Sequence, residues 1–341
     1  MIKSRWSRTI SSPCKINLHL VVGERRSDGF HELESIFAAL DYSDTLNFTF
    51  FPENDAKTIL SIQKDGVFQR LSQKGQIFPS IPMEKHLVYQ AVEVFRSKTG
   101  FSGNLEIELI KRIAPGSGLG CSSSNAASAL IMLNGLYGSR SSGESRLSGV
   151  SRLSKESLME MAKQLGSDVP FFIEIGIENR AKTKVRFVRG RGEILSSLPA
   201  FPRLEIVLVF PGFASYTGTA FALLDTHRKA SKSQNLSGSL TGFSAGDDRF
   251  FLSNGLWIEP KNWNFSNDFL DLFINHGSKE EKSAYTTILA DLKNVGAVFS
   301  GLSGSGSACF GIFSGQEEAE RAVEILNGAF YVVQRSFFLR Y

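Results

Sequence analysis

The stretch PGSGLGCSSSNAA, residues 115–127, decides how the rest of the sequence is interpreted. Three glycines alternate with other residues in it, and a cluster of hydroxyl side chains follows directly. Glycine lets a backbone turn sharply and lets its N–H groups approach an anion closely. A helix that begins after such a turn adds free amides and a partial positive charge. The pattern therefore predicts a phosphate-binding loop.

The segments on either side of this loop support the prediction. Residues 105–110, LEIELI, alternate between apolar and charged side chains, which is the period of a strand. From Ser123 to Tyr137 the apolar side chains recur at helical spacing, and residues 122–124 offer capping hydroxyls. The loop is not a Walker P-loop, because no Gly-Lys-Ser/Thr closes it. It is not the dinucleotide fingerprint either, because the third glycine comes one residue early.

Composition excludes several other classes of protein. The 341 residues, 42% of them hydrophobic, suffice for one large domain or two modest ones. The net charge is only +4 and the basic residues form no block, so we expect no nucleic-acid partner. Three cysteines without a CxxC spacing argue against a disulfide framework and a structural zinc, and favour a reducing cytoplasm. No apolar run reaches the length of a membrane-spanning helix.

Strands and helices alternate without a regular βαβ rhythm, which favours an α+β fold. Two helices are predicted, over 155–165 and near 317–327, and the polar turn of SDVPFFIEIG is expected to lead into an apolar strand. The other expected strands cover residues 13–22, 204–210, 295–300, 308–313 and 330–338. Polar segments 139–153 and 226–248 are interpreted as surface insertions, and a domain boundary is expected near residue 202.

Several motifs together resemble the GHMP kinases and, among them, the 4-diphosphocytidyl-methylerythritol kinases. The loop at 115–127 resembles the GHMP phosphate loop, and GLSGSGSACF at 301–310 resembles the third GHMP motif. GSDVPFF at 166–172 is similar to the family's GADVPFF. PCKINLHL, RRSDGFHELESIF and LDYSDTL resemble the family's PAKINL, GRRxDGYHEL and LD…D. The resemblance covers the first part of the chain nearly continuously and resumes at PGFASYTGTAF and FSNDF.

The resemblance implies a two-domain GHMP fold and a reaction. Residues 1–201 would form an N-terminal domain like domain 2 of ribosomal protein S5, and residues 202–341 a ferredoxin-like C-terminal domain. The enzyme would use ATP and Mg²⁺ to phosphorylate the 2-hydroxyl of 4-diphosphocytidyl-2-C-methyl-D-erythritol, in the non-mevalonate route to isoprenoids. Two alternatives stay open: another GHMP kinase, acting on homoserine or mevalonate, and a non-catalytic ligand sensor on the same fold.

The resemblance also implies roles for matching residues. Asp168 would be the catalytic base, and Lys15 would steady the developing charge beside it. Asn17 would contact the methylerythritol end, and the cytosine would be held by a group of four, Phe30, His31, Thr217 and Phe221. The ATP phosphates would lie on Pro115, Gly116, Ser117, Gly118, Leu119, Gly120, Cys121, Ser122, Ser123 and Ser124. Ser122 or Ser123 would reach the magnesium ion, whose remaining ligands the sequence leaves open.

Four positions depart from the family pattern. Phe30 stands where the family has Tyr, so a hydroxyl contact is lost while stacking remains possible. Cys14 and Cys121 replace an Ala and a loop Gly, and His86 replaces an Asn before the helix of the adenine pocket. A thiol in the crowded phosphate loop is expected to alter nucleotide affinity, and His86 puts a specific adenine contact in question.

Overall fold

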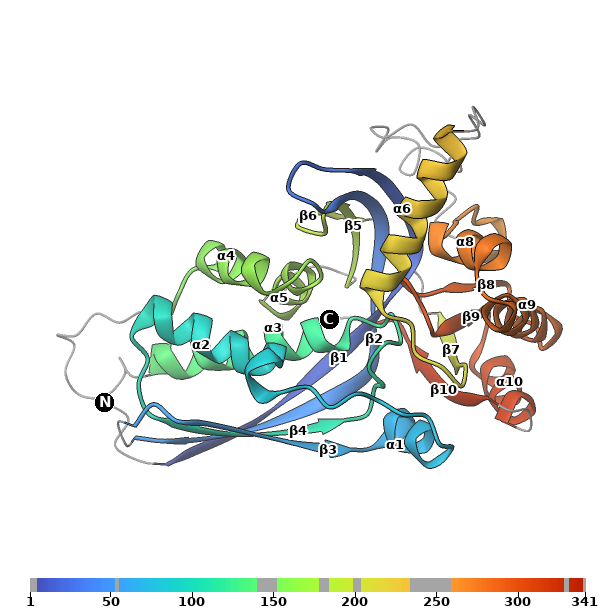
Figure 1. The fold of residues 1–341 in the computed structure, drawn as a ribbon. Helices are drawn as coiled ribbons and strands as arrows, with labels where there is room; N and C mark the ends of the chain where they lie inside the picture. Colours follow the sequence, from blue (N-terminus) through green and yellow to red (C-terminus); the bar gives the residue numbers. More distant parts are fainter. Residues whose placement is uncertain are drawn as a thin grey trace.

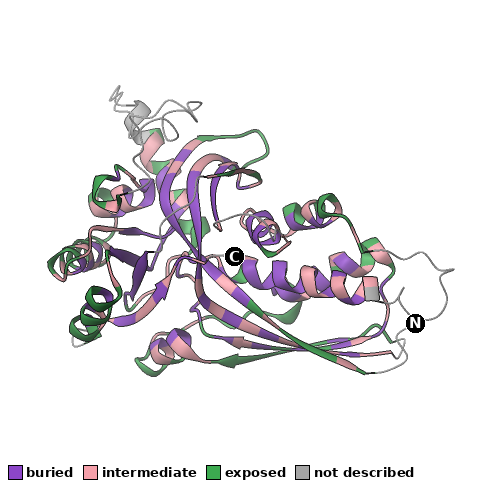
Figure 2. Ribbon diagram, turned by 180° about the vertical axis from the view of Figure 1, so that it is seen from behind, coloured by how far each residue is buried: buried purple, intermediate pink, exposed green. Residues whose placement is uncertain are grey.

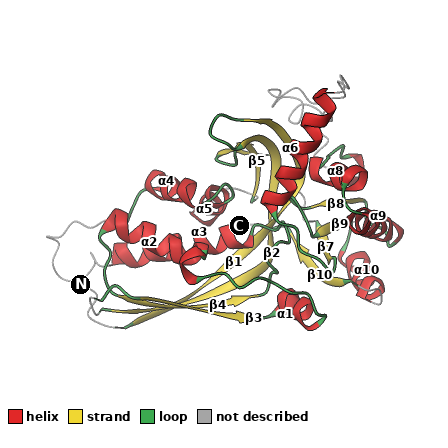
Figure 3. Ribbon diagram, viewed as in Figure 1, coloured by secondary structure: helices red, strands yellow, loops and turns green. Residues whose placement is uncertain are grey.

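The computed structural model describes residues 5–52, 55–139, 152–177, 184–198, 204–233, 259–327 and 331–339. They form two β-sheets that meet near the middle of the molecule (Figure 1). Helices α2–α5 cover the first sheet, and helices α8–α10 cover the second (Figure 3). The chain is therefore an α+β protein, as the mixed order of its strands and helices predicts.

Two long antiparallel strands organise the first sheet, whose strand order is β3-β4-β2-β5-β6, with β1 paired to β2. The strands are β1 (Trp6–Arg25), β2 (His31–Phe51), β3 (Thr58–Lys64), β4 (Asn104–Lys111), β5 (Val185–Gly190) and β6 (Ile194–Ser197). The predicted strand 13–22 lies within β1. Shifts of register flank Lys15 and Asn17, where β-bulges bend a strand and re-aim its side chains.

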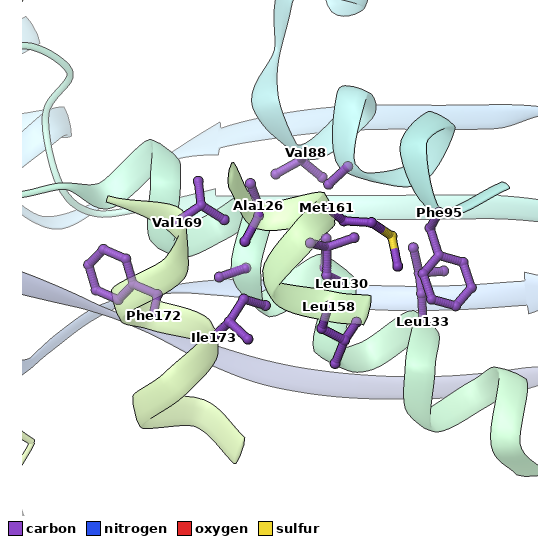
Figure 4. Close-up of a cluster of buried hydrophobic side chains, with 14 of the residues drawn as sticks. Val88, Phe95, Ala126, Leu130, Leu133, Leu158, Met161, Val169, Phe172 and Ile173 are labelled. Carbon is purple, nitrogen blue, oxygen red and sulfur yellow. The ribbon is translucent and has the colours of Figure 1, made fainter. Parts of the chain in front are cut away.

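The helices of this half are α1 (Gly66–Gln73), α2 (Leu87–Thr99), α3 (Cys121–Ser139), α4 (Lys155–Leu165) and α5 (Val169–Ile177), with a 3₁₀ turn at Met83–Lys85. Helices α2–α5 pack their apolar faces on one side of the first sheet, whereas the buried residues of α1 belong to the core where the two sheets meet. Helix α3 contacts α2, α4, α5 and β1. Its Ala126, Leu130 and Leu133 meet side chains of the neighbouring helices in a dry core (Figure 4). The predictions for α3 and α4 are confirmed, with α3 beginning two residues earlier.

The segment after Asp168 is a helix, so the expectation of a strand there is wrong. Helix α5 packs against α3 and α4, and six of its nine residues are buried. A short apolar run that is buried on all sides lacks the alternation that separates helix from strand. Pro170 fits because the first turn of a helix does not need its N–H group. The start of this helix carries Asp168 into the centre of the molecule.

The second sheet has the order β10-β7-β9-β8, with every pair antiparallel. Its strands are β7 (Glu205–Phe210), β8 (Phe299–Leu302), β9 (Cys309–Phe313) and β10 (Val332–Phe337). The helices of this half are α6 (Thr217–Ser233), α8 (Asp268–His276), α9 (Lys279–Asn294) and α10 (Gln316–Asn327), with a 3₁₀ turn at Pro260–Asn262. These bounds confirm the strands expected at 204–210, 308–313 and 330–338 and the helix near 317–327.

Two predicted segments of the second half differ from the structure. The strand expected at 295–300 begins only at Phe299, because Gly296, with φ +99°, closes helix α9 and Ala297 N donates to Leu292 O. Residues 226–233 of the supposed insertion 226–248 continue helix α6. The rest of that insertion and residues 140–151 of the first one lie outside the described residues.

The two sheets share a buried core where they meet. Ile16 and Leu40 of the first sheet belong to the same apolar cluster as Ile206 and Phe310 of the second. Burial is continuous across this junction when the molecule is seen from behind (Figure 2). Strands β6 and β7 belong to different sheets, and we therefore keep a domain boundary near residue 202 as a proposal.

Candidate active site

The two glycine-rich segments meet at the junction of the sheets. Gly118 has φ +75°, and a methyl group added there would lie 2.0 Å from the carbonyl oxygen of Ser303. The hydroxyl of Ser303 donates to the carbonyl of Gly118 at 3.0 Å. Only glycine permits both this backbone angle and this close approach. Position 118 must therefore be glycine because the loop that contains Ser303, far along the chain, packs against it.

The carbonyl groups of the first loop point away from solvent. Ser307 N donates to Gly116 O and Ala308 N donates to Ser117 O, both at 3.0 Å. Lys15 N donates to Leu119 O at 3.0 Å. With its carbonyl oxygens taken in this way, the loop does not repel an anion and can present N–H groups to it. The first turn of α3 follows directly and adds a partial positive charge.

A cleft of about 250 Å³ opens beside these loops. Its polar and glycine lining includes Lys15, Asn17, Gly116, Ser117, Gly118, Gly120, Cys121, Ser122, Ser123, Asp168, Ser215, Thr217, Gly304 and Ser305. Its apolar lining is Leu20, Leu33, Phe37, Leu119, Phe221 and Phe269. The cleft therefore brings together most of the residues singled out in the sequence, from both halves of the chain.

The three serines at the start of α3 differ in accessibility. Ser122 is exposed and Ser123 is half-buried, and both line the cleft. Ser124 is buried, and its hydroxyl accepts a 2.8 Å hydrogen bond from the hydroxyl of Ser12. Pro115 and Ser124 do not line the cleft. The side chain of Ser124 thus ties α3 to strand β1 and does not face the space where a phosphate would bind.

Lys15 and Asp168 form an ion pair in the cleft. Lys15 Nζ lies 3.5 Å from Asp168 Oδ2, and the lysine side chain is only 4% exposed against 27% for the aspartate. Lys15 Nζ also donates to Asn17 Oδ1 at 2.5 Å and lies 4.5 Å from the centre of the Phe37 ring. Asn17 is held in turn, because its Nδ2 donates to Ser35 Oγ at 2.9 Å. The cation is thus fixed, whereas the carboxylate can be reached from the cleft.

A buried ion pair supports the loop from behind. Lys111 Nζ lies 3.1 Å from Asp44 Oδ2 and 3.3 Å from Cys121 Sγ. Asp44 also accepts from Arg112 N, Ile113 N and Asn125 Nδ2, at 2.8, 2.9 and 2.9 Å. Burial opposes the Lys111 charge, but Cys121 and Asp44 together hold the pKa of Lys111 above its usual value. Both charges are therefore satisfied before any ligand binds. Asp44 is the final aspartate of the LDYSD segment.

Only two of the four residues predicted to hold a base line the cleft. Phe221 and Thr217 line the cleft, and the His31 ring stacks on Phe221 with ring centres 4.9 Å apart. His31 is buried and does not line the cleft. Phe30 is 45% exposed, and the guanidinium of Arg191 lies 4.8 Å from the centre of its ring. His31 and Phe221 pack directly on each other, so a base cannot lie between these two rings in this structure.

Sequence reasoning missed several residues of the cleft. Ser215 and Ser305 line it, and the hydroxyl of Ser215 donates to the carbonyl of Ser305 at 2.6 Å. It also missed Asp225, whose carboxylate lies 2.7 Å from His31 Nε2. The helical spacing of Thr217, Phe221 and Asp225 is a signal that could have found the last of these.

Comparison with known proteins agrees with this arrangement. Residues 86–176 match the family described as GHMP kinases N terminal domain, and residues 254–332 match the one described as GHMP kinases C terminal. The chain is 30% identical to the 4-diphosphocytidyl-2-C-methyl-D-erythritol kinase of Prosthecochloris aestuarii over 95% of both chains. It is 33% identical to the enzyme of that name from Solibacter usitatus, over 92% of this chain and 83% of the other.

Solved structures give the same result. A crystal structure of 4-(cytidine 5′-diphospho)-2C-methyl-D-erythritol kinase is 25% identical, with a TM-score of 0.67 over 97% of this chain and 98% of that one. A homoserine kinase from Cytophaga hutchinsonii shares the fold, with a TM-score of 0.58 over 98% and 95% of the two chains, at 15% identity. The fold expected from the motifs is thereby confirmed. In the part of the chain that the structure describes, no helix is long and apolar enough to cross a bilayer.

Proposed function

Because the chain belongs to the 4-diphosphocytidyl-2-C-methyl-D-erythritol kinases of the GHMP superfamily, we propose that its cleft transfers the γ-phosphoryl group of ATP to the 2-hydroxyl of that cytidyl substrate. It is an enzyme, a phosphotransferase with an alcohol as acceptor. The observation that carries the reaction is the Lys15–Asp168 pair, which lies in one cleft with the glycine-rich loop. We further propose that the enzyme works in the cytoplasm, without nucleic acid as a partner.

Phosphoryl transfer depends mainly on alignment and on neutralising charge. In our proposal the N–H groups of the loop and the start of α3 hold the ATP phosphates. The exposed hydroxyl of Ser122 and the half-buried hydroxyl of Ser123 add donors at the same place. The acceptor alcohol then approaches along the side of the cleft where Asp168 lies.

Asp168 would accept the proton of the attacking hydroxyl. Its carboxylate is partly exposed to the cleft, as a base that meets a substrate must be. Lys15 holds this carboxylate in place through the 3.5 Å ion pair. The same ammonium group neutralises charge that develops as the phosphoryl group is transferred. Asn17 accepts a hydrogen bond from Lys15 and, in our proposal, contacts the methylerythritol end of the substrate.

The cleft fits magnesium that arrives with ATP. Among the described residues that line it, Asp168 alone carries a carboxylate, while Ser122 and Ser123 offer hydroxyl oxygens. Mg²⁺ commonly keeps several waters and binds phosphate oxygens together with one or two protein oxygens. Asp44 is not a candidate ligand, because its oxygens are already occupied by Lys111 and by donors around it. We therefore propose Mg–ATP as the substrate, with Ser122 or Ser123 reaching the ion.

The cytidyl group is assigned to the end of the cleft formed by Thr217 and Phe221. An aromatic ring with polar neighbours suits a planar base. Phe30, at the exposed turn before His31, would cover the base from the outside. A homoserine or mevalonate substrate has no base to place there, and the two relatives described above do not favour these alternatives. The presence of both Lys15 and Asp168 also speaks against a non-catalytic sensor.

The test is turnover with a matched variant. Purified protein with ATP, Mg²⁺ and 4-diphosphocytidyl-methylerythritol should release ADP only when the cytidyl substrate is present. Asp168→Asn should bind both substrates but release ADP at least about 100-fold more slowly, as expected for loss of a general base. Near-normal turnover by Asp168→Asn would refute the assignment of the base. ADP release that depends on homoserine or mevalonate instead would refute the substrate.

A further inference from the structure

We propose that Asp225 is a positioning residue that fixes the tautomer and orientation of His31, so that the site accepts a cytosine and rejects a uracil. The inference rests on the proposed function and adds to it a residue that no sequence motif marks. The observation behind it is the contact between His31 Nε2 and Asp225 Oδ1, at 2.7 Å.

Asp225 determines which ring nitrogen of His31 carries a hydrogen. A carboxylate only accepts hydrogen bonds, so the nitrogen that faces it must be the donor. Arg25 lies on the far side of the same carboxylate, with Nη1 3.9 Å from Asp225 Oδ2. The histidine side chain is 6% exposed, so the bond forms away from most of the solvent. Asp225 therefore holds His31 with Nε2 protonated.

Packing fixes the plane of the imidazole. The His31 and Phe221 rings are stacked, with an interplanar angle of 25°. Phe221 is itself held edge-on by Phe269, at 4.9 Å between ring centres. Phe221 and Asp225 are one turn apart on α6, so a single helix face supplies both the stacking partner and the hydrogen-bond acceptor. The ring cannot rotate without losing both contacts.

His31 itself does not line the cleft, so in the proposal a base bound against Phe221 reaches past the lining to Nδ1 of the histidine. Within the described part of the chain, Nε2 has Asp225 as its partner and Nδ1 has no hydrogen bond. The proposal requires a neutral ring, in which hydrogen on Nε2 leaves Nδ1 as an acceptor. The exocyclic amine of cytosine is a donor and suits it, whereas uracil carries a carbonyl at the same position. Two facing acceptors repel, and a site built to accept a hydrogen bond rejects a ligand that cannot donate one.

The decisive experiment compares two nucleotides that differ at this one group. Calorimetry would measure the affinity of cytidine 5′-diphosphate and of uridine 5′-diphosphate, with ADP at saturation so that the phosphate loop is filled. The wild type should bind the cytidine compound at least about 10-fold more tightly, which corresponds to about 1.4 kcal/mol. Asp225→Ala should bring the two affinities within about 3-fold of each other. Nitrogen NMR of His31 should show hydrogen on Nε2 in the wild type and mixed tautomers in the variant.

Two further variants serve as controls for this test. Asp225→Asn retains an acceptor oxygen but can also donate to Nε2, so it should lose discrimination while the fold is kept. Asp65→Ala removes an aspartate outside the cleft, which pairs with Arg112, and should leave the preference unchanged. If Asp225→Ala weakens both nucleotides equally, Asp225 is merely structural and the proposal is wrong. Equal affinities in the wild type would overturn it as well.

The proposed reaction and this inference fail in different ways. A wild-type protein that releases no ADP but prefers the cytidine compound, with that preference lost in Asp225→Ala, would refute the reaction and support the role of Asp225. A protein that releases ADP equally well with the cytidyl substrate and its uridyl counterpart would support the reaction and refute the role of Asp225.

Discussion

The ammonium nitrogen of Lys15 lies 3.5 Å from a carboxylate oxygen of Asp168, although one residue is in the first strand and the other precedes helix α5. The pair is asymmetric, because the lysine is buried and the aspartate is partly open to the cleft. An arrangement of this kind holds a base in place while leaving it free to meet a substrate. It provides the first of four predictions.

Replacing Lys15 by Met should impair catalysis more than folding. The variant keeps an unbranched side chain of similar length and removes the charge that lies over the Phe37 ring and beside Asp168. We expect kcat to fall by about 100-fold or more, which is typical when one preorganised electrostatic contact is lost. Steady-state release of ADP would measure it. Lys98→Met, which removes a half-exposed lysine paired with Glu160, is the control, and equal losses in the two variants would contradict the prediction.

Replacing Gly118 by Ala should disrupt the contact between the two glycine-rich loops. The added methyl group would lie 2.0 Å from Ser303 O, on a backbone with φ +75°. We expect the KM for ATP to rise at least about 10-fold, because the loop must shift to relieve the clash. Gly135→Ala in helix α3 is the matched control, since a methyl group there meets nothing within 4 Å. It should stabilise the fold by about 0.5–1 kcal/mol. An unchanged KM in Gly118→Ala would show that the loops need not interlock.

Replacing Lys111 by Met should destabilise the fold. It leaves the fully buried Asp44 carboxylate without its cation. Breaking a buried pair in this way costs about 3–5 kcal/mol. The double variant with Asp44→Asn should recover part of the loss, because the amide oxygen can still accept from Arg112 N and Ile113 N. Urea unfolding of the wild type, the two single variants and the double variant would measure the coupling, and additive losses would argue against a charge pair.

The imidazole of His86 should make the fold sensitive to mild acid. It caps helix α2, with Nδ1 accepting from Val88 N at 3.3 Å, which requires that nitrogen to be unprotonated. Burial, followed by the nearby Lys111 cation, lowers the pKa of His86 from 6.5 to about 4. The native state therefore binds fewer protons than the unfolded state in this range, so the contribution is complete above pH 6.5 and is lost as pH falls through 4.

The measurement is the free energy of unfolding at pH 7 and pH 5, in the wild type and in His86→Asn. Asparagine also caps helices, so the two proteins should be similar at pH 7. Between pH 7 and pH 5 the wild type should lose about 2 kcal/mol more than the variant. The difference between the proteins isolates His86, because burial also lowers the pKa of His19 to about 4 in both. Parallel losses would show that His86 is not the sensitive group.

The local patterns of the sequence determined a good deal of this protein. Spacing alone predicted three features: the turn of the phosphate loop at residues 115–120, the helix that follows it, and the polar face of strand β1. Such features depend on backbone freedom, capping and periodicity, which act between residues close together in the chain. The same local signals failed at α5, where an apolar segment is buried on all sides and carries no period.

Only the tertiary structure decided which of these groups meet. The closure of Gly118 on Ser303, the ion pair of Lys15 with Asp168 and the bond of Asp225 to His31 join segments far apart in the sequence. Local periodicity does not determine these contacts, because a side chain that pairs across the fold looks like any other polar residue of its own helix or strand. The sequence indicated that Lys15 lies beside Asp168 only through the family resemblance. The sequence determined the parts of a phosphate site, and the packing of the two sheets determined that they form one cleft.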